Sequence, residues 1–131
     1  MEEGGEIARP GHDLPLSIDT RHQDGTVYVD VRGELDLATA PQLAVRLDAL
    51  RTSIRPRVLI DLSGLEFCDS TGLRVVIGAA RELRAAGGRV VVACPAAGPV
   101  GRLLEIVGAT EWLDVHEDAE LALAALTPRR A

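Results

Sequence analysis

Strict alternation of apolar and other residues marks the first part of the chain. It runs over 14–19 and again over 27–32, on either side of a turn signal at 22–25. A period of two residues is typical of strands with one packed face and one wetter face. The two segments therefore predict an antiparallel hairpin, and Pro15 favours a place for the first strand at the edge of a sheet.

Helical spacing and short, continuous apolar runs alternate over the rest of the chain. The spacing of apolar residues predicts four helices, over 40–50, 70–86, 100–107 and 118–126. Apolar runs predict buried strands over 58–62 and 89–94, and a short last strand is expected over 112–115. A capping box at 39–42 is expected to start the first helix. A short loop over 63–69 is expected to lead into the second helix.

This order of elements predicts an α/β fold. We expect one mixed β-sheet with an N-terminal antiparallel hairpin and parallel central strands, with the helices packed on the sheet. The length of 131 residues suits a single domain. Its predicted bounds are 13–127, with a flexible N-terminal tail over 1–12 and a C-terminal tail over 128–131.

Composition and charge exclude several classes of function. The 14 basic residues are all arginine and the net charge is −6, which argues against a nucleic-acid partner and excludes P-loop and Schiff-base lysine chemistry. No apolar run approaches the roughly 20 residues that a membrane-spanning helix requires, so membrane insertion is not expected. The acidic N-terminus lacks the pattern of a signal peptide. We therefore expect a cytoplasmic protein.

No metal, cofactor or catalytic site is expected. Cys68 and Cys94 are interpreted as small buried residues in a reducing compartment. The three histidines are scattered without the spacing of metal ligands. Because no base–nucleophile pair or phosphate cradle accompanies them, the chain is not expected to be an enzyme.

The segment Asp69-Ser70-Thr71-Gly72 follows a buried strand and opens the second helix. In the plainer interpretation its polar residues cap the helix, because their oxygens accept free backbone N–H groups. The second interpretation is a phosphoacceptor, since a hydroxyl at a helix N-terminus lies near solvent and near the positive end of the helix dipole. A phosphate there would add about −1.5 to −2 charges to a surface where a partner docks, while the fold survives.

Four segments together carry a family resemblance. They are Val-Arg-Gly-Glu-Leu-Asp at 31–36, the run 59–73 that ends in Asp-Ser-Thr-Gly-Leu, Gly-Gly-Arg-Val-Val-Val at 87–92, and the helix at 100–108. In this order and spacing, the chain resembles the STAS domain of the anti-sigma factor antagonist family over residues 14–126.

The resemblance implies a phosphorylation switch at Ser70. In the family, the serine after the aspartate of this motif is the acceptor, and its kinase is the partner itself, an anti-sigma factor that is also an ATP-dependent serine kinase. The unphosphorylated antagonist binds this kinase and frees its sigma factor. Phosphorylation ends the binding, and a metal-dependent serine phosphatase restores it. The implied partner-binding residues are Glu34, Asp36, Asp69, Ser70, Thr71, Gly72 and Arg74.

Other interpretations of these residues stay open. Thr71 is a second hydroxyl, although its place in the first turn favours capping or packing. Arg74, where many family members have glycine, could pair with a phosphate on Ser70, but we interpret it as a solvated residue of the helix face. Glu34 and Asp36 are interpreted as polar residues of a surface loop that contributes to docking, rather than as catalytic carboxylates.

The alternative function is structural. A STAS subunit of a lipid-transport ATPase or a stress-sensing complex would have the same fold, and its Ser70 would be an ordinary helix cap. An enzyme or nucleotide-binding domain on this scaffold is a weaker alternative, because the sequence offers no residues for the chemistry.

Overall fold

The computed structural model describes residues 15–126, and the predicted tails over 1–12 and 128–131 lie outside this range. Its elements follow one another in the order that the hydrophobic pattern predicts. The strands are β1 (Ser17–Gln23), β2 (Thr26–Leu35), β3 (Arg57–Cys68), β4 (Arg89–Ala93) and β5 (Val115–His116). The helices are α1 (Ala40–Asp48), α2 (Ser70–Ala85), α3 (Pro99–Ile106) and α4 (Ala119–Leu126), and a short 3-10 helix, η2 (Ala49–Thr52), follows α1.

The five strands form one mixed sheet in the order β1-β2-β3-β4-β5. β1 pairs antiparallel with β2 through a tight turn, in which Asp24 and Gly25 have φ angles of 52° and 79°. Two positive φ angles in succession suit the right-handed twist of a hairpin. The other neighbouring strands pair in parallel. The predicted α/β fold, with its N-terminal hairpin and parallel central strands, is therefore confirmed.

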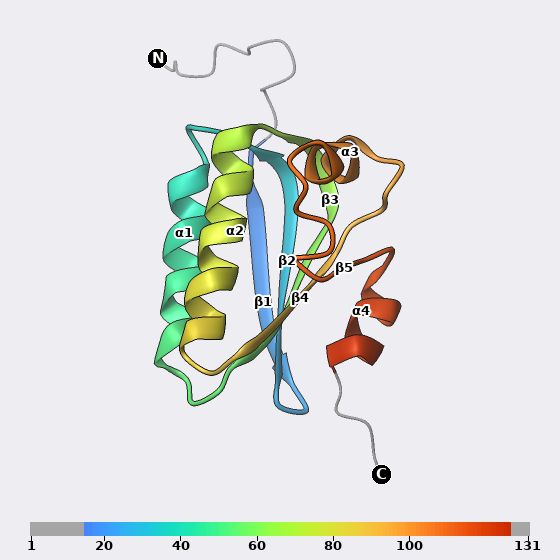
Figure 1. The fold of residues 1–131 in the computed structure, drawn as a ribbon. Coiled ribbons are helices and arrows are strands. Elements are labelled where there is room, and N and C mark those ends of the chain that lie inside the picture. The colour runs from blue at the N-terminus through green and yellow to red at the C-terminus, as the bar shows by residue number, and fades with distance from the viewer. Residues whose placement is uncertain (1–14, 127–131) are drawn as a thin grey trace, which may run out of the picture.

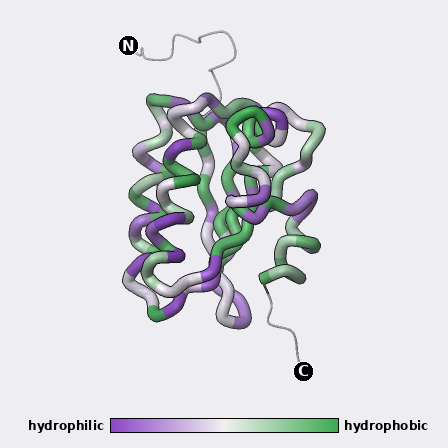
Figure 2. The backbone as a smooth tube through the Cα atoms, in the orientation of Figure 1, coloured by the Kyte–Doolittle hydropathy of each residue, from purple (hydrophilic) through white to green (hydrophobic). Residues whose placement is uncertain are grey.

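Helices cover the two faces of the sheet unequally (Figure 1). α1 and α2 lie on one face, where they and α3 share the larger apolar core with the central strands. α4 lies on the other face, where Ala122 and Leu126 form a smaller cluster with Leu59 of β3 and Val91 of β4. The central strands are strongly hydrophobic in Figure 2, as expected for parallel strands covered on both faces.

β2 and β3 are longer than the apolar runs predict. The segment 63–69 is predicted to be a short loop, but its residues through Cys68 continue β3. The cause is pairing with a distant segment, since Glu34 lies opposite Phe67 and Leu35 opposite Cys68. Two shifts of register accompany this pairing, which is typical of bulged strands. The predicted loop is therefore wrong.

Two local predictions are also wrong. The side chain of Thr39 does not cap α1, because its hydroxyl is hydrogen-bonded within the preceding turn. Pro41 does stand in the first turn of α1, where a missing N–H costs little. The last strand begins at Val115 instead of 112, because the chain turns through Asp114, whose φ is 64°.

Parallel pairing brings the C-terminal ends of β2 and β3 to one edge of the sheet, the upper edge in Figure 1. α2 begins there, directly after β3, and α3 lies at the same end of the molecule. The Asp-Ser-Thr-Gly motif therefore stands at the junction of strand ends and a helix start, where side chains can reach solvent.

Candidate functional site

Asp69 fixes the start of α2. Its backbone is extended (φ −99°, ψ 179°), and its Oδ1 accepts a hydrogen bond of 2.8 Å from the N–H of Gly72. Its own N–H donates to the carbonyl oxygen of Leu35 at 3.2 Å, which ties the helix start to the end of β2. The predicted cap of α2 is confirmed, and the aspartate provides it.

Ser70 is the first residue of α2, and it is exposed. Within residues 15–126, its hydroxyl takes part in no hydrogen bond. Asp69 already accepts the hydrogen bond from the backbone N–H that a capping hydroxyl would accept, so the helix does not need the Ser70 hydroxyl as a cap. Thr71 beside it is half-buried. Of the two hydroxyls in the motif, that of Ser70 is thus the more accessible to another protein.

Gly72 lets α2 begin close to β2. A Cβ at this position would lie 2.5 Å from Cγ of Leu35 and 2.9 Å from its carbonyl oxygen. Both distances are shorter than van der Waals contact, so a larger residue requires the helix or the strand to move. Gly72 is buried and has a packing role. Its expected contact with a partner stays a prediction.

The turn after β2 is closed by Asp36 and Thr39. Oδ1 of Asp36 accepts hydrogen bonds from the N–H groups of Ala38 (3.0 Å) and Thr39 (3.1 Å). The Thr39 hydroxyl accepts from the N–H of Asp36 at 2.9 Å and donates to the carbonyl oxygen of Glu34 at 3.0 Å. An aspartate that bonds to the backbone two residues ahead is a standard way to stabilise a turn.

Glu34 and Asp36 are buried, with 5% of each residue exposed. The expectation that they are polar residues of a surface loop is therefore wrong. Glu34 belongs to the extended end of β2, and the Asp36 carboxylate accepts hydrogen bonds from the backbone N–H groups of Ala38 and Thr39. Leu37, which follows them, is 72% exposed. No local pattern marks this position, and a single exposed apolar residue is common on protein surfaces.

A hollow of about 210 Å³ opens beside Ser70. It is lined by Ser70, Leu73, Arg74 and Ile77 of α2 and by Val107, which follows α3. Arg74 is exposed, as its interpretation as a residue of the helix face requires. Val107 was predicted only as part of an apolar helix stripe, yet 48% of it is exposed. Its place beside Ser70 depends on how α2 and α3 pack, and no local pattern predicts it.

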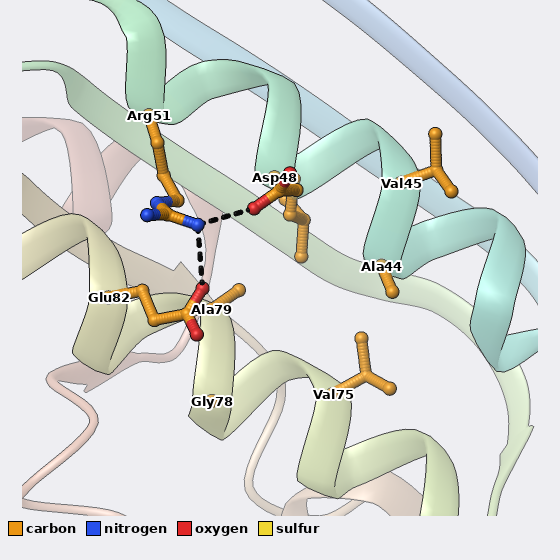
Figure 3. A pocket seen from close by; sticks show the side chains of 9 residues that line it. Ala44, Val45, Asp48, Arg51, Val75, Gly78, Ala79 and Glu82 are labelled. Atoms are coloured by element: carbon orange, nitrogen blue, oxygen red, sulfur yellow. Dashed lines mark hydrogen bonds and ion pairs between the residues drawn. The ribbon is translucent and has the colours of Figure 1, made fainter.

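A larger hollow of about 410 Å³ lies between α1 and α2 (Figure 3). Small residues such as Ala44 and Gly78 line it and keep it open. At one end the guanidinium of Arg51 lies 2.7 Å from the carboxylate of Asp48 and 3.5 Å from that of Glu82. Such exposed ion pairs contribute little to stability. The candidate phosphoacceptor does not line this groove, so the site built around Ser70 does not include it.

The two cysteines are free thiols. Burial raises the pKa of Cys68 to about 12, and the neighbouring Asp69 carboxylate adds to this effect. Burial likewise raises the pKa of Cys94 to about 11. Because the thiolate is the reactive form, neither cysteine is suited to nucleophilic chemistry near neutral pH.

Residues 15–126 contain neither a candidate membrane-spanning helix nor a candidate metal-binding cluster. Among their helices, none is long and apolar enough to cross a membrane. Over residues 15–126, no three His, Cys, Asp or Glu residues gather in a way that could hold a metal ion.

Comparisons with known proteins agree with this architecture. The STAS domain family model matches residues 17–122. The anti-sigma F factor antagonist of Paenibacillus polymyxa is 30% identical over 114 residues, which cover 86% of this chain and 97% of that protein. The crystal structure of an anti-sigma factor antagonist from Mycobacterium paratuberculosis matches with a TM-score of 0.76 and 27% identity, over 85% of this chain and 93% of that one.

The Bacillus cell fate determinant SpoIIAA in its phosphorylated form has the same fold. Its TM-score is 0.64 at 23% identity, over 85% of this chain and 100% of that one. The family model covers nearly all of the described residues, and the relative from Paenibacillus aligns over almost its whole length. The chain therefore belongs to the STAS domain family of anti-sigma factor antagonists.

Proposed function

We propose that this chain is an anti-sigma factor antagonist that is switched by phosphorylation of Ser70. In its unphosphorylated form it binds an anti-sigma factor that is also a serine kinase, and it thereby frees a sigma factor. Phosphorylation of Ser70 ends the binding, and a serine phosphatase restores it. The chain acts as a binding module and as a substrate, while the catalytic residues belong to its partners.

One observation carries this proposal: Ser70 is exposed at the start of α2, while Asp69 performs the capping. A serine whose hydroxyl capped the helix would be engaged with the backbone and expensive to modify. Here the hydroxyl can be modified without the loss of a hydrogen bond that the fold needs. The name of the relative from Paenibacillus, an anti-sigma F factor antagonist, supports the same class of partner.

Phosphoryl transfer requires little of the acceptor chain. A bond forms between Oγ of Ser70 and the γ-phosphorus of ATP, the bond from that phosphorus to the β–γ bridging oxygen breaks, and ADP leaves. The hydroxyl proton passes to a base of the kinase. The phosphate then stands at the N-terminus of α2, where the helix dipole favours a negative charge by about 0.3–1 kcal/mol. The Asp69 carboxylate opposes part of this gain, so the fold changes little in stability.

Intact-mass analysis after incubation with purified anti-sigma factor kinases and Mg-ATP tests the proposal. Wild type and Thr71→Ala are expected to gain one phosphoryl group, and Ser70→Ala none. Ser63→Ala removes another exposed serine, on β3, and is the matched control that should behave as wild type. In calorimetric titrations, Ser70→Ala should retain binding to the kinase, whereas Ser70→Asp should weaken it.

The other outcomes are equally informative. A phosphoryl group on Ser70→Ala would move the acceptor to another residue. Stable binding without phosphorylation of wild type would make the chain a non-phosphorylated antagonist. Neither binding nor phosphorylation with any of these kinases would favour the alternative of a STAS subunit in a larger assembly.

A further inference from the structure

A stripe of side chains leads away from Ser70 along one side of α2. Its members are Ser70, Arg74, Ile77 and Arg81, at positions i, i+4, i+7 and i+11. This spacing places them on the same side of a helix with 3.6 residues per turn. Both arginines are exposed and Ile77 is half-buried. The stripe therefore alternates cationic and apolar groups next to the proposed phosphoacceptor.

Two residues from the segment after α3 complete this surface. Val107 shares the 210 Å³ hollow with Ser70 and Arg74. The ring of Trp112 lies beside Arg81, with 5.1 Å between the guanidinium carbon and the ring centroid. Val107 and Trp112 are 48% and 43% exposed. We call these two residues and the four of the stripe the docking face.

Arg84 holds the Trp112 end of the docking face in place. Its guanidinium donates hydrogen bonds to the carbonyl oxygens of Trp112 (3.0 Å), Leu113 (3.2 Å) and Val90 (2.9 Å). A planar guanidinium that serves three carbonyls joins the turn before β5 to α2 and β4. The surface is thus preorganised, which lowers the entropy cost of binding.

The docking face is basic although the chain is acidic. The net charge of the chain is −6, yet between residues 70 and 81 the only charged residues of α2 are Arg74 and Arg81. The next residue, Glu82, reaches toward η2, where its carboxylate lies 3.5 Å from the guanidinium of Arg51. Guanidinium groups beside exposed apolar side chains are complementary to carboxylates that flank an apolar anchor.

We infer that the docking face receives a segment of the anti-sigma factor in which acidic residues flank an apolar side chain. The inference rests on the proposed function and adds the chemistry of the partner. The apolar side chain enters the hollow beside Val107 and Ile77, and the partner's carboxylates pair with Arg74 and Arg81. A contact surface with a central apolar anchor and a charged rim is typical of specific protein–protein interfaces.

The same geometry gives the switch a physical cause. A phosphate on Ser70 brings about −1.5 to −2 charges to one end of the docking face. There it competes for the guanidinium of Arg74 and repels the partner's carboxylates. Like charges facing each other across an interface oppose association, so the modified chain releases its partner without any change of fold.

Calorimetric titration with the anti-sigma factor that wild type binds tests the inference, at low and at high salt. Arg74→Glu and Arg81→Glu are each expected to weaken binding by about tenfold or more at low salt, and to reduce its salt dependence. Arg46→Glu, the same charge change at an exposed position of α1, is the control and should stay within about twofold of wild type.

A second variant separates charge from folding. Arg81→Gln loses the contact with the Trp112 ring as Arg81→Glu does, but it introduces no carboxylate, so the pair separates loss of the cation from reversal of charge. The thermal midpoint of every variant is recorded. Val107→Ser tests the apolar hollow that receives the partner's side chain. Ile54→Ser, at a residue that is 92% exposed, is its control. Weaker binding of the docking-face variants at an unchanged thermal midpoint supports the inference.

The two proposals can fail separately. If wild type binds and Arg74→Glu and Arg81→Gln bind equally well, the inference is overturned while the proposed function stands. If wild type binds none of the anti-sigma factors, the proposed function is overturned and the inference with it. If an acidic residue of the partner is changed to arginine and binding of Arg74→Glu recovers, the paired carboxylate is identified.

Discussion

Two glycines of α2 allow the same substitution to be made in opposite environments. Gly78 lines the groove between α1 and α2, and nothing lies within 4 Å of the position that its Cβ would take. Gly78→Ala is therefore expected to stabilise the fold by about 0.5–1 kcal/mol, the difference in helix propensity between the two residues. At Gly72 the added methyl would stand 2.5 Å from Cγ of Leu35 and 2.9 Å from its carbonyl oxygen.

At Gly72 two effects therefore oppose each other. Helix propensity favours alanine by at most about 1 kcal/mol, and overpacking costs about 1–3 kcal/mol. Because one of the crowded atoms belongs to the backbone of β2, it cannot rotate away as the end of a flexible side chain can. We expect Gly72→Ala to lose up to about 2 kcal/mol net. Because both variants share the gain in helix propensity, it should lie below Gly78→Ala by the overpacking cost, about 1–3 kcal/mol.

Urea unfolding, followed by the fluorescence of the single tryptophan, measures this difference directly. The two variants carry the same chemical change in the same helix, so effects on the unfolded chain largely cancel. Equal stability of the two variants, or a Gly72→Ala protein more stable than wild type, would refute the reasoning that Gly72 sets the approach of α2 to β2. Gly72→Ala should also slow phosphorylation of Ser70, since the acceptor moves with the helix start.

Two further predictions follow from the cap of α2 and from the thiols. Asp69→Ala should lower the free energy of unfolding by about 1 kcal/mol, and Asp69→Asn by much less, because asparagine also accepts the N–H of Gly72. Thermal melting checks this prediction. Equally stable alanine and asparagine variants would contradict it. The folded-state pKa of Cys68 (about 12) and of Cys94 (about 11) lies above the ordinary value of a thiol, so the unfolded chain ionises first as the pH rises. Their contribution to stability is complete below about pH 8 and is lost progressively as the pH rises through 11 and 12. Urea unfolding is measured at about pH 8 and about pH 10. Between these two pH values, the free energy of unfolding should fall more for wild type than for a Cys68→Ala, Cys94→Ala double variant. An equal fall in both proteins would disprove the thiols' contribution to this pH dependence.

The order of strands and helices could be predicted because it follows from local patterns of apolar residues. The period of two residues over 27–32 and the helical period over 100–107 each depend on residues close in sequence. The same holds for the cap of α2, since Asp69 and the N–H that it accepts are three residues apart. Such features do not require knowledge of the rest of the fold.

Features that depend on distant pairing could not be predicted. Residues 63–68 include Gly64 and Glu66, which form strands poorly, and they join β3 because the end of β2 lies beside them. The same pairing draws Glu34 into a strand and buries it. The exposure of Val107 beside Ser70 arises from the packing of two helices, so the docking face has no counterpart in a local pattern.

The division of tasks between Asp69 and Ser70 has a consequence for how such a protein can evolve. Because the neighbouring aspartate caps the helix, selection for a stable fold does not preserve the serine. Under the proposed function, only its phosphorylation by a kinase does. A lineage that loses its kinase can replace the serine in one mutational step and retain a folded protein that binds its target permanently. A lineage with an unmodifiable residue at this position can acquire the switch by the reverse step. Regulation can thus be gained or lost on this scaffold without passing through an unstable ancestor.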